Sequence, residues 1–327
     1  MDAYFDYVNM NLIPRRCIVE SRSQCDTSVY IGKHLFALPV VPANMECVID
    51  TKLAIKLASS GHFYIMHRFG GDTREFAATM KAHGLFISIS VGINTDSYEL
   101  LEQLKADCLD PDYITIDIAH GHSESVQNMI KWIRIKFGSS VYIIAGNVST
   151  VDAVHDLEDW GADAIKVGIG PGSACTTYNV TGFGSRDIQA SIVGECARAA
   201  TRALIIADGN IKCPGDIAKS LALGAGLVMI GGMFSALIDS PGNTVELNGM
   251  QYKEYWGSAS ALATGKSTRI EGTKNLMSTK SRTVLEEMVY LKECLQSAIS
   301  YGGGHDLECF KEIRWILHNT NCFDNRT

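Results

Sequence analysis

Residues 141–168 read VYIIAGNVSTVDAVHDLEDWGADAIKVG and contain a strand, a helix and a second strand. The runs 141–146 and 164–168 are almost entirely apolar, as expected of parallel strands covered on both faces. Between them, residues 151–160 follow Thr150, whose hydroxyl can cap a helix N-terminus. Gly161 suits the left-handed end of that helix. The stretch therefore predicts one β–α–β unit.

The same pattern recurs along the whole chain. Apolar runs occupy residues 39–45, 63–67, 86–91, 113–118, 141–146, 164–168, 203–209 and 227–232. Further helices are predicted over residues 50–60 and 213–223. Eight strands that alternate with helices indicate an α/β fold of the (β/α)8 TIM-barrel type. An open doubly wound sheet is the alternative, and it is disfavoured because no G-x-G-x-x-G motif opens a first helix.

No linker divides the sequence, so we expect residues 1–327 to form a single barrel domain. The segment after the eighth run is too long to be one barrel helix. It predicts a hairpin around residues 245–252, within a flap at about residues 240–280. Closing C-terminal helices are expected at about residues 281–327.

Composition excludes several classes of protein. The chain has 29 Lys and Arg against 36 Asp and Glu, a formal charge of −7. This balance, with no basic block, argues against a nucleic-acid partner. No apolar run approaches the length of about 18 residues that suggests a membrane span, and the N-terminus lacks a signal-peptide pattern. The ten cysteines form no C-x-x-C pair, which is typical of reduced thiols in a cytoplasmic protein.

Barrel active sites lie at the C-terminal ends of the strands. The residues that follow the predicted strands include Asn44, His67, Arg68, Asp117, Asn147, Asp208, Gly209, Gly231 and Gly232. A polar residue at any one of these positions is explained at least as well by capping of the next helix.

The loop after the sixth run is more informative. It reads Gly168-Ile169-Gly170-Pro171-Gly172-Ser173-Ala174-Cys175-Thr176-Thr177. Alternating glycines let the backbone approach a ligand, with amides that can hold phosphate and carbonyls that can hold a monovalent cation. Cys175 is either an activated nucleophile or an incidental thiol in a glycine turn, and the loop alone does not choose between them.

The loops after the seventh and eighth runs indicate a phosphorylated ligand. They open with Asp208-Gly209-Asn210 and Gly231-Gly232-Met233. Phosphate in these barrels is frequently bound at this place, where small residues give access to backbone amides. Asp208 is a candidate for ribose hydroxyls or a base edge, with the reactive end of the ligand over Cys175.

These residues resemble the IMP dehydrogenase and GMP reductase family. The loop from Gly168 to Thr177, followed by Gly182-Phe183-Gly184, is similar to that family's catalytic-cysteine loop. Other motifs follow in family order over nearly the whole chain. They are Phe5-Asp6-Tyr7, Pro42-Ala43-Asn44-Met45, Ile116-Asp117-Ile118-Ala119-His120-Gly121, Ala145-Gly146-Asn147-Val148, Ala207-Asp208-Gly209, Ser240-Pro241-Gly242 and Ser297-Ala298-Ile299-Ser300-Tyr301-Gly302-Gly303.

Within the family, the chain resembles the reductase branch. An ordinary helix separates the second and third runs, which leaves no room for the regulatory insert usual in the dehydrogenase. The sequence contains no Arg-Tyr dipeptide, the pair carried by the dehydrogenase's hydrolytic flap. Ile270-Glu271-Gly272 resembles the reductase's glutamate-bearing flap.

Three stretches depart from the family pattern. Asn210 replaces the third residue of Asp-Gly-Gly, and asparagine is the least costly substitute where φ is positive. Phe234-Ser235-Ala236 replaces Phe-Ala-Gly, and Ser185-Arg186-Asp187 is unusual.

The resemblance implies reductive deamination of GMP to IMP and ammonia with NADPH. Cys175 would form a covalent thioimidate at purine C2. Thr177 and Glu271 would relay the proton that ammonia needs to leave. The alternative for Glu271 is a solvated surface carboxylate, and for Thr177 it is a turn hydroxyl bonded to its own backbone.

The resemblance also implies binding roles. Ser173, Gly209, Gly231 and Gly232 would hold the phosphate, Asp208 the ribose, and Ser258 would lie near the base. Arg68 would bind the extra phosphate of NADPH or else form an ion pair. Asp117 and Ala119 would lie near the nicotinamide, although Asp117 could equally orient His120. The carbonyls of Gly170, Gly172 and Cys175 would hold potassium, and the chain would form a homotetramer.

Two rival functions remain at this stage. One is an IMP dehydrogenase that forms XMP with NAD. The other is a non-catalytic guanine-nucleotide-binding barrel, which the altered residues around positions 185–187, 210 and 235–236 would suit.

Overall fold

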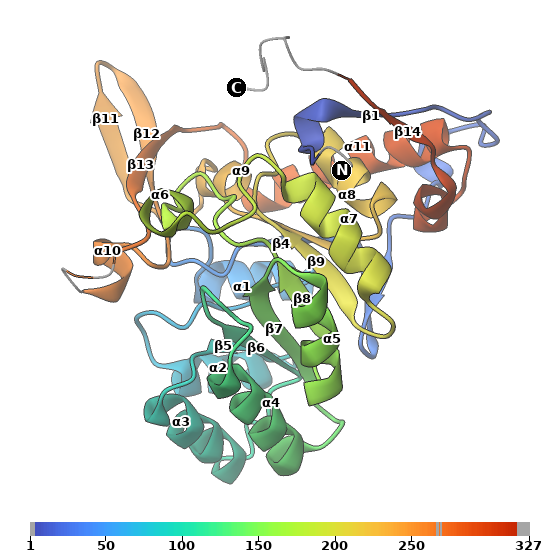
Figure 1. Ribbon diagram of the computed structural model, residues 1–327. Coiled ribbons are helices and arrows are strands. Elements are labelled where there is room, and N and C mark those ends of the chain that lie inside the picture. The colour runs from blue at the N-terminus through green and yellow to red at the C-terminus, as the bar shows by residue number, and fades with distance from the viewer. Residues whose placement is uncertain (1–3, 266–267, 269, 319–327) are drawn as a thin grey trace.

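The computed structural model describes residues 4–265, 268 and 270–318. Its main sheet has seven parallel strands among these residues, in the order β4-β10-β9-β8-β7-β6-β5 (Figure 1). The strands are β4 (Val40–Pro42), β5 (Ser88–Val91), β6 (Tyr113–Asp117), β7 (Tyr142–Val148), β8 (Ala164–Val167), β9 (Leu204–Asp208) and β10 (Leu227–Ile230). β4, which comes first of these strands in the sequence, pairs with β10, which comes last. The sheet therefore curls as a (β/α)8 barrel requires. Seven of the eight predicted strands are thus confirmed.

The predicted strand at residues 63–67 is wrong as a hydrogen-bonded strand. The segment is still buried and extended beside β5, and the backbone N–H of Met66 donates to the Ser88 carbonyl at 3.2 Å. The Tyr64 hydroxyl then takes over the neighbouring ladder positions. It donates to the Phe86 carbonyl at 2.8 Å and accepts the Ser88 N–H at 3.1 Å. A side chain therefore replaces the backbone pairing that would define an eighth strand.

The longer helices lie outside the sheet, and two short ones follow strands at its C-terminal end (Figure 1). They are α1 (Thr51–Ser59), α2 (Thr73–Ala82), α3 (Thr95–Ala106), α4 (Glu124–Phe137), α5 (Val151–Trp160), α6 (Thr177–Thr181), α7 (Gln189–Ala199), α8 (Pro214–Ala222) and α9 (Gly232–Ser235). The predictions of α1, α5 and α8 are confirmed. The Thr150 hydroxyl caps α5 by accepting the Ala153 N–H at 3.3 Å. Gly161 ends that helix in the left-handed conformation, with φ of 113°.

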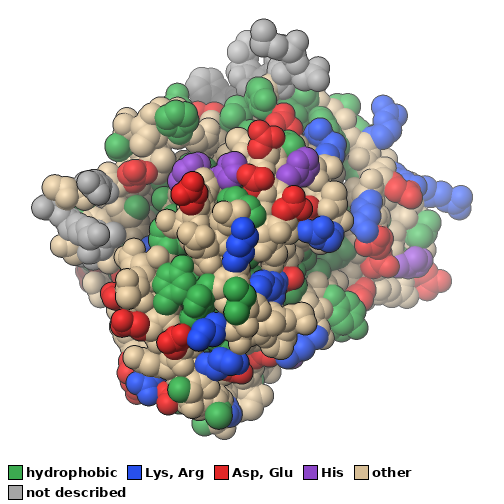
Figure 2. All heavy atoms as spheres, turned by 60° about the horizontal axis from the view of Figure 1, so that its bottom comes forward, with side chains coloured by type: hydrophobic (Ala, Val, Ile, Leu, Met, Phe, Trp, Pro, Cys, Tyr) green, Lys and Arg blue, Asp and Glu red, His purple; other side chains and the backbone are tan. Residues whose placement is uncertain are grey.

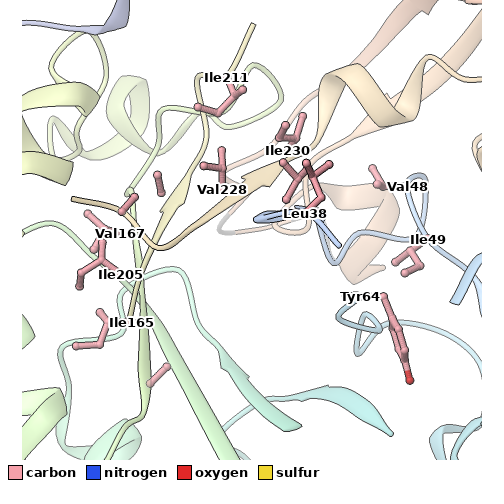
Figure 3. Packing of buried hydrophobic residues seen from close by; sticks show 14 of the residues in the cluster. Leu38, Val48, Ile49, Tyr64, Ile165, Val167, Ile205, Ile211, Val228 and Ile230 are labelled. Carbon is pink, nitrogen blue, oxygen red and sulfur yellow. The ribbon is translucent and has the colours of Figure 1, made fainter. Parts of the chain in front are cut away.

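Two hydrophobic clusters lie on opposite faces of the curled sheet. The outer cluster packs strands against helices, and Figure 3 shows Ile165 and Val167 of β8 beside Ile205 of β9. The inner cluster contains the alternate residues Ala164 and Ile206. Phe63 and Ile65 also belong to the inner cluster and Tyr64 to the outer one. Residues 63–65 therefore alternate between the two faces as a strand would.

A short N-terminal hairpin packs on the inner cluster. It consists of β2 (Val29–Ile31) and β3 (His34–Phe36). Ile31 and Phe36 join the inner cluster, and the Tyr113 hydroxyl of β6 donates to the Ile31 carbonyl at 2.7 Å. Tyr113 begins β6, so the hairpin covers the N-terminal end of the barrel and leaves the C-terminal end for ligands.

The C-terminal region forms the predicted hairpin and a docked flap. An antiparallel sheet of β11 (Thr244–Leu247), β12 (Met250–Trp256) and β13 (Lys274–Ser278) projects from the barrel (Figure 1), with α10 (Ala261–Thr264) between its last two strands. Residues 266, 267 and 269 of the predicted flap lie outside the described residues.

The closing region is only partly helical. One long helix, α11 (Val284–Gly302), is followed by the 3-10 helix η3 (Leu307–Glu312) and β14 (Trp315–Leu317). β14 pairs with β1 (Met10–Leu12), beside the 3-10 helix η1 (Tyr7–Asn9), and a further 3-10 helix, η2 (Arg22–Gln24), follows. The closing helices predicted at about residues 281–327 are therefore present as α11 and η3, whereas β14 was not predicted, and residues 319–327 lie outside the described part.

No helix in the described part of the chain is both long and apolar enough to span a bilayer. The face in Figure 2 carries acidic and basic side chains interspersed, without one continuous basic patch.

Candidate active site

Cys175 lies at the C-terminal end of the barrel beside two polar side chains. Its Sγ is 3.2 Å from the Thr177 hydroxyl, and that hydroxyl donates to Glu271 Oε2 at 2.6 Å. Thr177 is 8% exposed, so most of this contact is shielded from water. The three predicted catalytic residues are therefore in one hydrogen-bonded row, although 94 residues separate Thr177 from Glu271 in sequence.

Backbone hydrogen bonds hold the flap against the cysteine loop. The Thr176 N–H donates to the Glu271 carbonyl at 2.9 Å, and the Thr273 N–H donates to the Ala174 carbonyl at 2.9 Å. These two bonds flank a bridge between Cys175 and Gly272. They fix the register of the flap, so the Glu271 side chain is aimed at Thr177.

A glycine permits this close approach. A Cβ atom on Gly257 would lie 2.7 Å from the Ala174 carbonyl oxygen, which no ordinary side chain allows. The predicted base-site residue Ser258 follows in the same turn and is half-buried. It therefore lies close to the cysteine loop, and its contact with the base stays a prediction.

The glycines of the cysteine loop pack against the end of β9. Gly168 has φ of 143°, and a Cβ there would lie 2.1 Å from the Asp208 carbonyl oxygen. Gly170 has φ of 77°. The Gly172 carbonyl accepts the Cys175 N–H at 3.0 Å, and a carbonyl keeps a second lone pair for another partner. Potassium at the carbonyls of Gly170, Gly172 and Cys175 stays a prediction.

The predicted phosphate residues lie near one another. A Cβ on Gly209 would come within 3.2 Å of the Gly172 backbone nitrogen, which brings the loops after β8 and β9 together. A Cβ on Gly232 would lie 3.9 Å from the Ser173 hydroxyl, and one on Gly231 would lie 2.6 Å from the Tyr255 hydroxyl. Gly231 and Gly232 thus leave room for the side chains of Tyr255 and Ser173 next to the loop after β10.

Tyr255 was not predicted as a site residue. It is 4% exposed, and burial raises the pKa of its phenol, so the group stays protonated and can donate. It belongs to β12, next to the predicted Ser258 turn, and that proximity was the available signal in the sequence.

The backbone of Asn210 has the positive φ at which asparagine was the expected substitute for glycine. It has φ of 60°, the left-handed conformation in which asparagine is tolerated better than most residues. Its side-chain amide also donates to Asp6 Oδ2, which attaches the N-terminal segment to the loop after β9. The departure from the family pattern is therefore compensated by a contact that glycine could not make.

A buried lysine connects several strand ends. Lys166 of β8 is 2% exposed, and its Nζ lies 3.2 Å from Asp208 Oδ2 and 3.3 Å from Asp117 Oδ1. It also lies 3.4 Å from Asn44 Oδ1. Asn147 donates its side-chain N–H to the same Asp208 oxygen at 2.8 Å. Lys166 was not among the residues predicted from the sequence, although the neighbouring strand-end residues were.

Arg68 and Asp117 form the ion pair that was the alternative for Arg68. The Arg68 Nε donates to the Asp117 carbonyl at 3.2 Å and lies 3.6 Å from Oδ2. Burial alone would raise the pKa of Asp117, but Lys166 and Arg68 outweigh it and lower the pKa. The carboxylate therefore stays ionised. Ala119 is exposed nearby in sequence, and its cofactor contact stays a prediction.

The structure brings together most of the predicted site. No cluster of three or more His, Cys, Asp or Glu that could hold a metal ion occurs among the described residues. A barrel that aligns a thiol, a hydroxyl and a carboxylate at its mouth has the arrangement expected of the class of enzymes that use a cysteine nucleophile.

Comparison with known proteins identifies the family within that class. The family model described as "IMP dehydrogenase / GMP reductase domain" matches residues 4–322, and the chain belongs to this family. The relatives named GMP reductase include those of Bacillus licheniformis, 49% identical over 99% of both chains, and Bacillus subtilis, 48% identical over 99% of both. That of Albidiferax ferrireducens is 50% identical over 95% of both.

Proposed function

We propose that this chain is a GMP reductase, which converts GMP to IMP and ammonia with NADPH as the reductant. The observation that carries the proposal is the row Cys175, Thr177 and Glu271, with the carboxylate supplied by the flap. The relatives that share about half of its residues over nearly the whole chain bear the same name.

The direction of the hydrogen bonds supports the first step. Thr177 donates to Glu271, so its oxygen is available to accept the Cys175 proton. An ordinary thiol is only a few per cent ionised near neutral pH and needs such a proton acceptor. The thiol proton passes to Glu271 through Thr177, and the sulfur forms a bond to purine C2.

The same carboxyl group then acts as an acid. Ammonia is a usable leaving group only when the amine is protonated, and Glu271 now carries the proton taken from the thiol. The C2–N bond breaks, ammonia leaves, and a thioimidate to Cys175 remains. NADPH, when bound, supplies the hydride that reduces C2. The carbon–sulfur bond breaks to release IMP, and the thiolate regains a proton.

The residues at the C-terminal ends of the strands would bind the two ligands. Ser173, Gly209, Gly231 and Gly232 would hold the nucleotide phosphate, Asp208 the ribose and Ser258 the base. Members of this family use a nicotinamide cofactor, and Arg68, Asp117 and Ala119 would hold it here. Among the described residues, none bonds the two terminal nitrogens of Arg68, whose side chain is 34% exposed. A guanidinium group whose two terminal nitrogens can still donate fits the extra phosphate that distinguishes NADPH.

Three further features belong to the proposal. Potassium would bind the carbonyls of Gly170, Gly172 and Cys175. Residues 1–327 would form one domain, and four copies would assemble in the cytoplasm.

The direct test is to mix purified protein with GMP and NADPH and follow the absorbance of NADPH. Loss of NADPH with equimolar IMP and ammonia is expected. A parallel reaction with IMP and NAD tests the dehydrogenase, and formation of NADH and XMP there would contradict the proposal. GMP binding without turnover would favour the non-catalytic barrel.

Cys175→Ala tests the covalent route. The variant should still bind GMP, but turnover should be lost because no thioimidate can form. Cys17→Ala removes an exposed thiol elsewhere and should keep wild-type activity. Appreciable turnover by Cys175→Ala would contradict the covalent mechanism.

A further inference from the structure

Lys166 is a charged residue within an otherwise apolar strand. Along β8 its neighbours Ile165 and Val167 belong to the outer cluster, so Lys166 faces into the barrel. Met229 Sδ lies 3.7 Å from its Nζ. A buried ammonium loses its hydration, which is costly unless charged partners replace the water.

Its partners come from three strand ends and from opposite sides. Asp117 ends β6 and Asp208 ends β9, and both carboxylates lie within hydrogen-bonding distance of the Lys166 Nζ. On its other side, Asp117 faces Arg68, whereas Asp208 accepts from Asn147. One side chain therefore links the proposed cofactor side of the mouth to the proposed nucleotide side.

Stability alone is a weak explanation for this lysine. A buried ion pair can often be replaced by apolar residues of similar volume without loss of stability. Met229 lies beside the Lys166 Nζ, and the inner cluster lies on the same face of the sheet, so packing at this position does not call for a charge. The geometry instead favours a role at the two carboxylates.

We propose that Lys166 is a positioning residue, which fixes Asp117 relative to Asp208 and so holds the cofactor and nucleotide ends of the site together over Cys175. This inference rests on the proposed function for the identity of the two ligands.

The charges of the site give this role a measurable signature. The titratable and charged groups that face one another here are Lys166, Asp117, Asp208, Arg68 and Tyr255. Two cations balance two carboxylates while Tyr255 stays neutral. Loss of Lys166 leaves an excess negative charge where anionic ligands bind. It also removes one of the two cations beside Asp117, which raises the pKa of Asp117.

Lys166→Met is the decisive variant because it keeps a long unbranched side chain and removes the charge. We expect kcat/KM for both GMP and NADPH to fall about 10- to 100-fold, as displacement of positioned groups does. NADPH binding is expected to weaken at low pH, on what we call the acidic limb of its pH dependence. This acidic limb should move toward neutral pH by about 1 to 3 pH units, the range for loss of a close opposite charge. Lys166→Arg keeps the charge and should restore the limb.

Lys253→Met is the matched control. Lys253 is 5% exposed, and its Nζ donates to the carbonyls of Ser240 and Gly242. Its removal should lower the melting temperature and leave the pH limb in place. If Lys166→Met fails to fold, Lys166→Met with Asp208→Asn keeps the net charge of the site and is titrated in the same way; an unmoved limb there contradicts the proposal.

Three results would overturn the role of Lys166. They are a wild-type pH limb in Lys166→Met, unchanged KM values for both ligands, or a Lys166→Arg variant more impaired than Lys166→Met. Wild-type turnover is measured first, and its absence would contradict the proposed function instead. Fluorescence titration of NADPH and calorimetric titration of GMP against pH would still decide the role of Lys166.

Discussion

Thr177 connects the thiol to the carboxylate, and its one hydroxyl has two different partners. It donates to Glu271 Oε2 at 2.6 Å and lies 3.2 Å from Cys175 Sγ. The two contacts use the hydroxyl's proton and its lone pair separately, so both can exist at once. Two alternatives were a turn hydroxyl bonded to its own backbone for Thr177 and a solvated surface carboxylate for Glu271. The bond between these two side chains fits neither alternative.

Glu271→Gln removes the proton carrier and keeps the shape of the flap. We expect release of ammonia from GMP to slow about 100-fold or more, the usual range for general acid–base groups. Reduction of a preformed thioimidate should slow much less, because it needs no proton from this group. Rapid-quench measurement of the two half-reactions separates them. Equal slowing of both would contradict the special role of Glu271.

Thr177→Val removes the hydroxyl and keeps the branched shape. It should lower kcat about 100-fold, because the thiol loses its path to the carboxylate. Thr177→Ser keeps an equivalent hydroxyl and should stay within about tenfold of wild type. Steady-state rates with GMP and NADPH make the comparison, and similar rates for the two variants would show that the hydroxyl carries no proton.

Some site residues could be predicted from sequence and others could not. Cys175 lies in a glycine-rich loop that is visible in the sequence, whereas Thr177 and Glu271 are predicted only through the family resemblance. Lys166 is hidden because a lysine within an apolar run resembles a residue at the edge of a strand. Its role depends on Asp117 and Asp208, which only the closed sheet brings to it.

At the scale of elements, the flap is positioned by backbone contacts rather than by its side chains. Its residues 271–273 exchange hydrogen bonds with the cysteine loop, and Gly257 lets the chain pass next to the Ala174 carbonyl. These bonds join the flap to a loop and not to a barrel strand. We therefore expect a small displacement of the flap to leave the barrel folded.

Gly257→Ala should displace the flap. Its Cβ would lie 2.7 Å from a backbone carbonyl oxygen that cannot easily move. We expect kcat/KM to fall at least about tenfold, since a misplacement of about 1 Å is costly in a catalytic row, while the melting temperature changes little. Gly215→Ala, where the nearest atom is 3.8 Å away, is the control. Wild-type activity of Gly257→Ala would show that the flap tolerates a shift.

The elements themselves were largely predictable because barrel strands are continuous apolar runs. The exception at residues 63–67 has a local cause. The sequence shows the apolar run, but it cannot show that the Tyr64 hydroxyl replaces the backbone partners of Phe86 and Ser88. The strand β14 escaped prediction for another reason, because it exists only through its pairing with β1 at the far end of the chain.

The whole molecule should lose stability in two stages as the pH falls. Burial lowers the pKa of His62 and His67 below 6.5, so the unfolded chain takes up these protons first. Their contribution is therefore lost as the pH drops from about 6.5 through the folded pKa values. For Glu158, burial acts to raise the pKa, but N–H donors from Ala203 and Arg202 lower it below 4.5. Its contribution is lost later, below about pH 4.5.

His62→Gln should flatten the first stage. We expect the melting temperature to fall about 2–4 °C less between pH 7 and pH 5.5 than in the wild type, the response of a large domain to about 1 kcal/mol. Calorimetry over this pH range makes the measurement, with the exposed His83→Gln as control. Parallel curves for His62→Gln and wild type would assign the loss to other groups.

The position of Glu271 on the flap has a consequence for the resting protein. The barrel supplies the sulfur, whereas the residue proposed to accept its proton arrives only with a separate segment that is docked through residues 271–273. A molecule with its flap displaced would hold the sulfur without its proposed proton acceptor. The rate of alkylation at Cys175 would then differ between the docked and displaced states and would report how much of the time each is occupied.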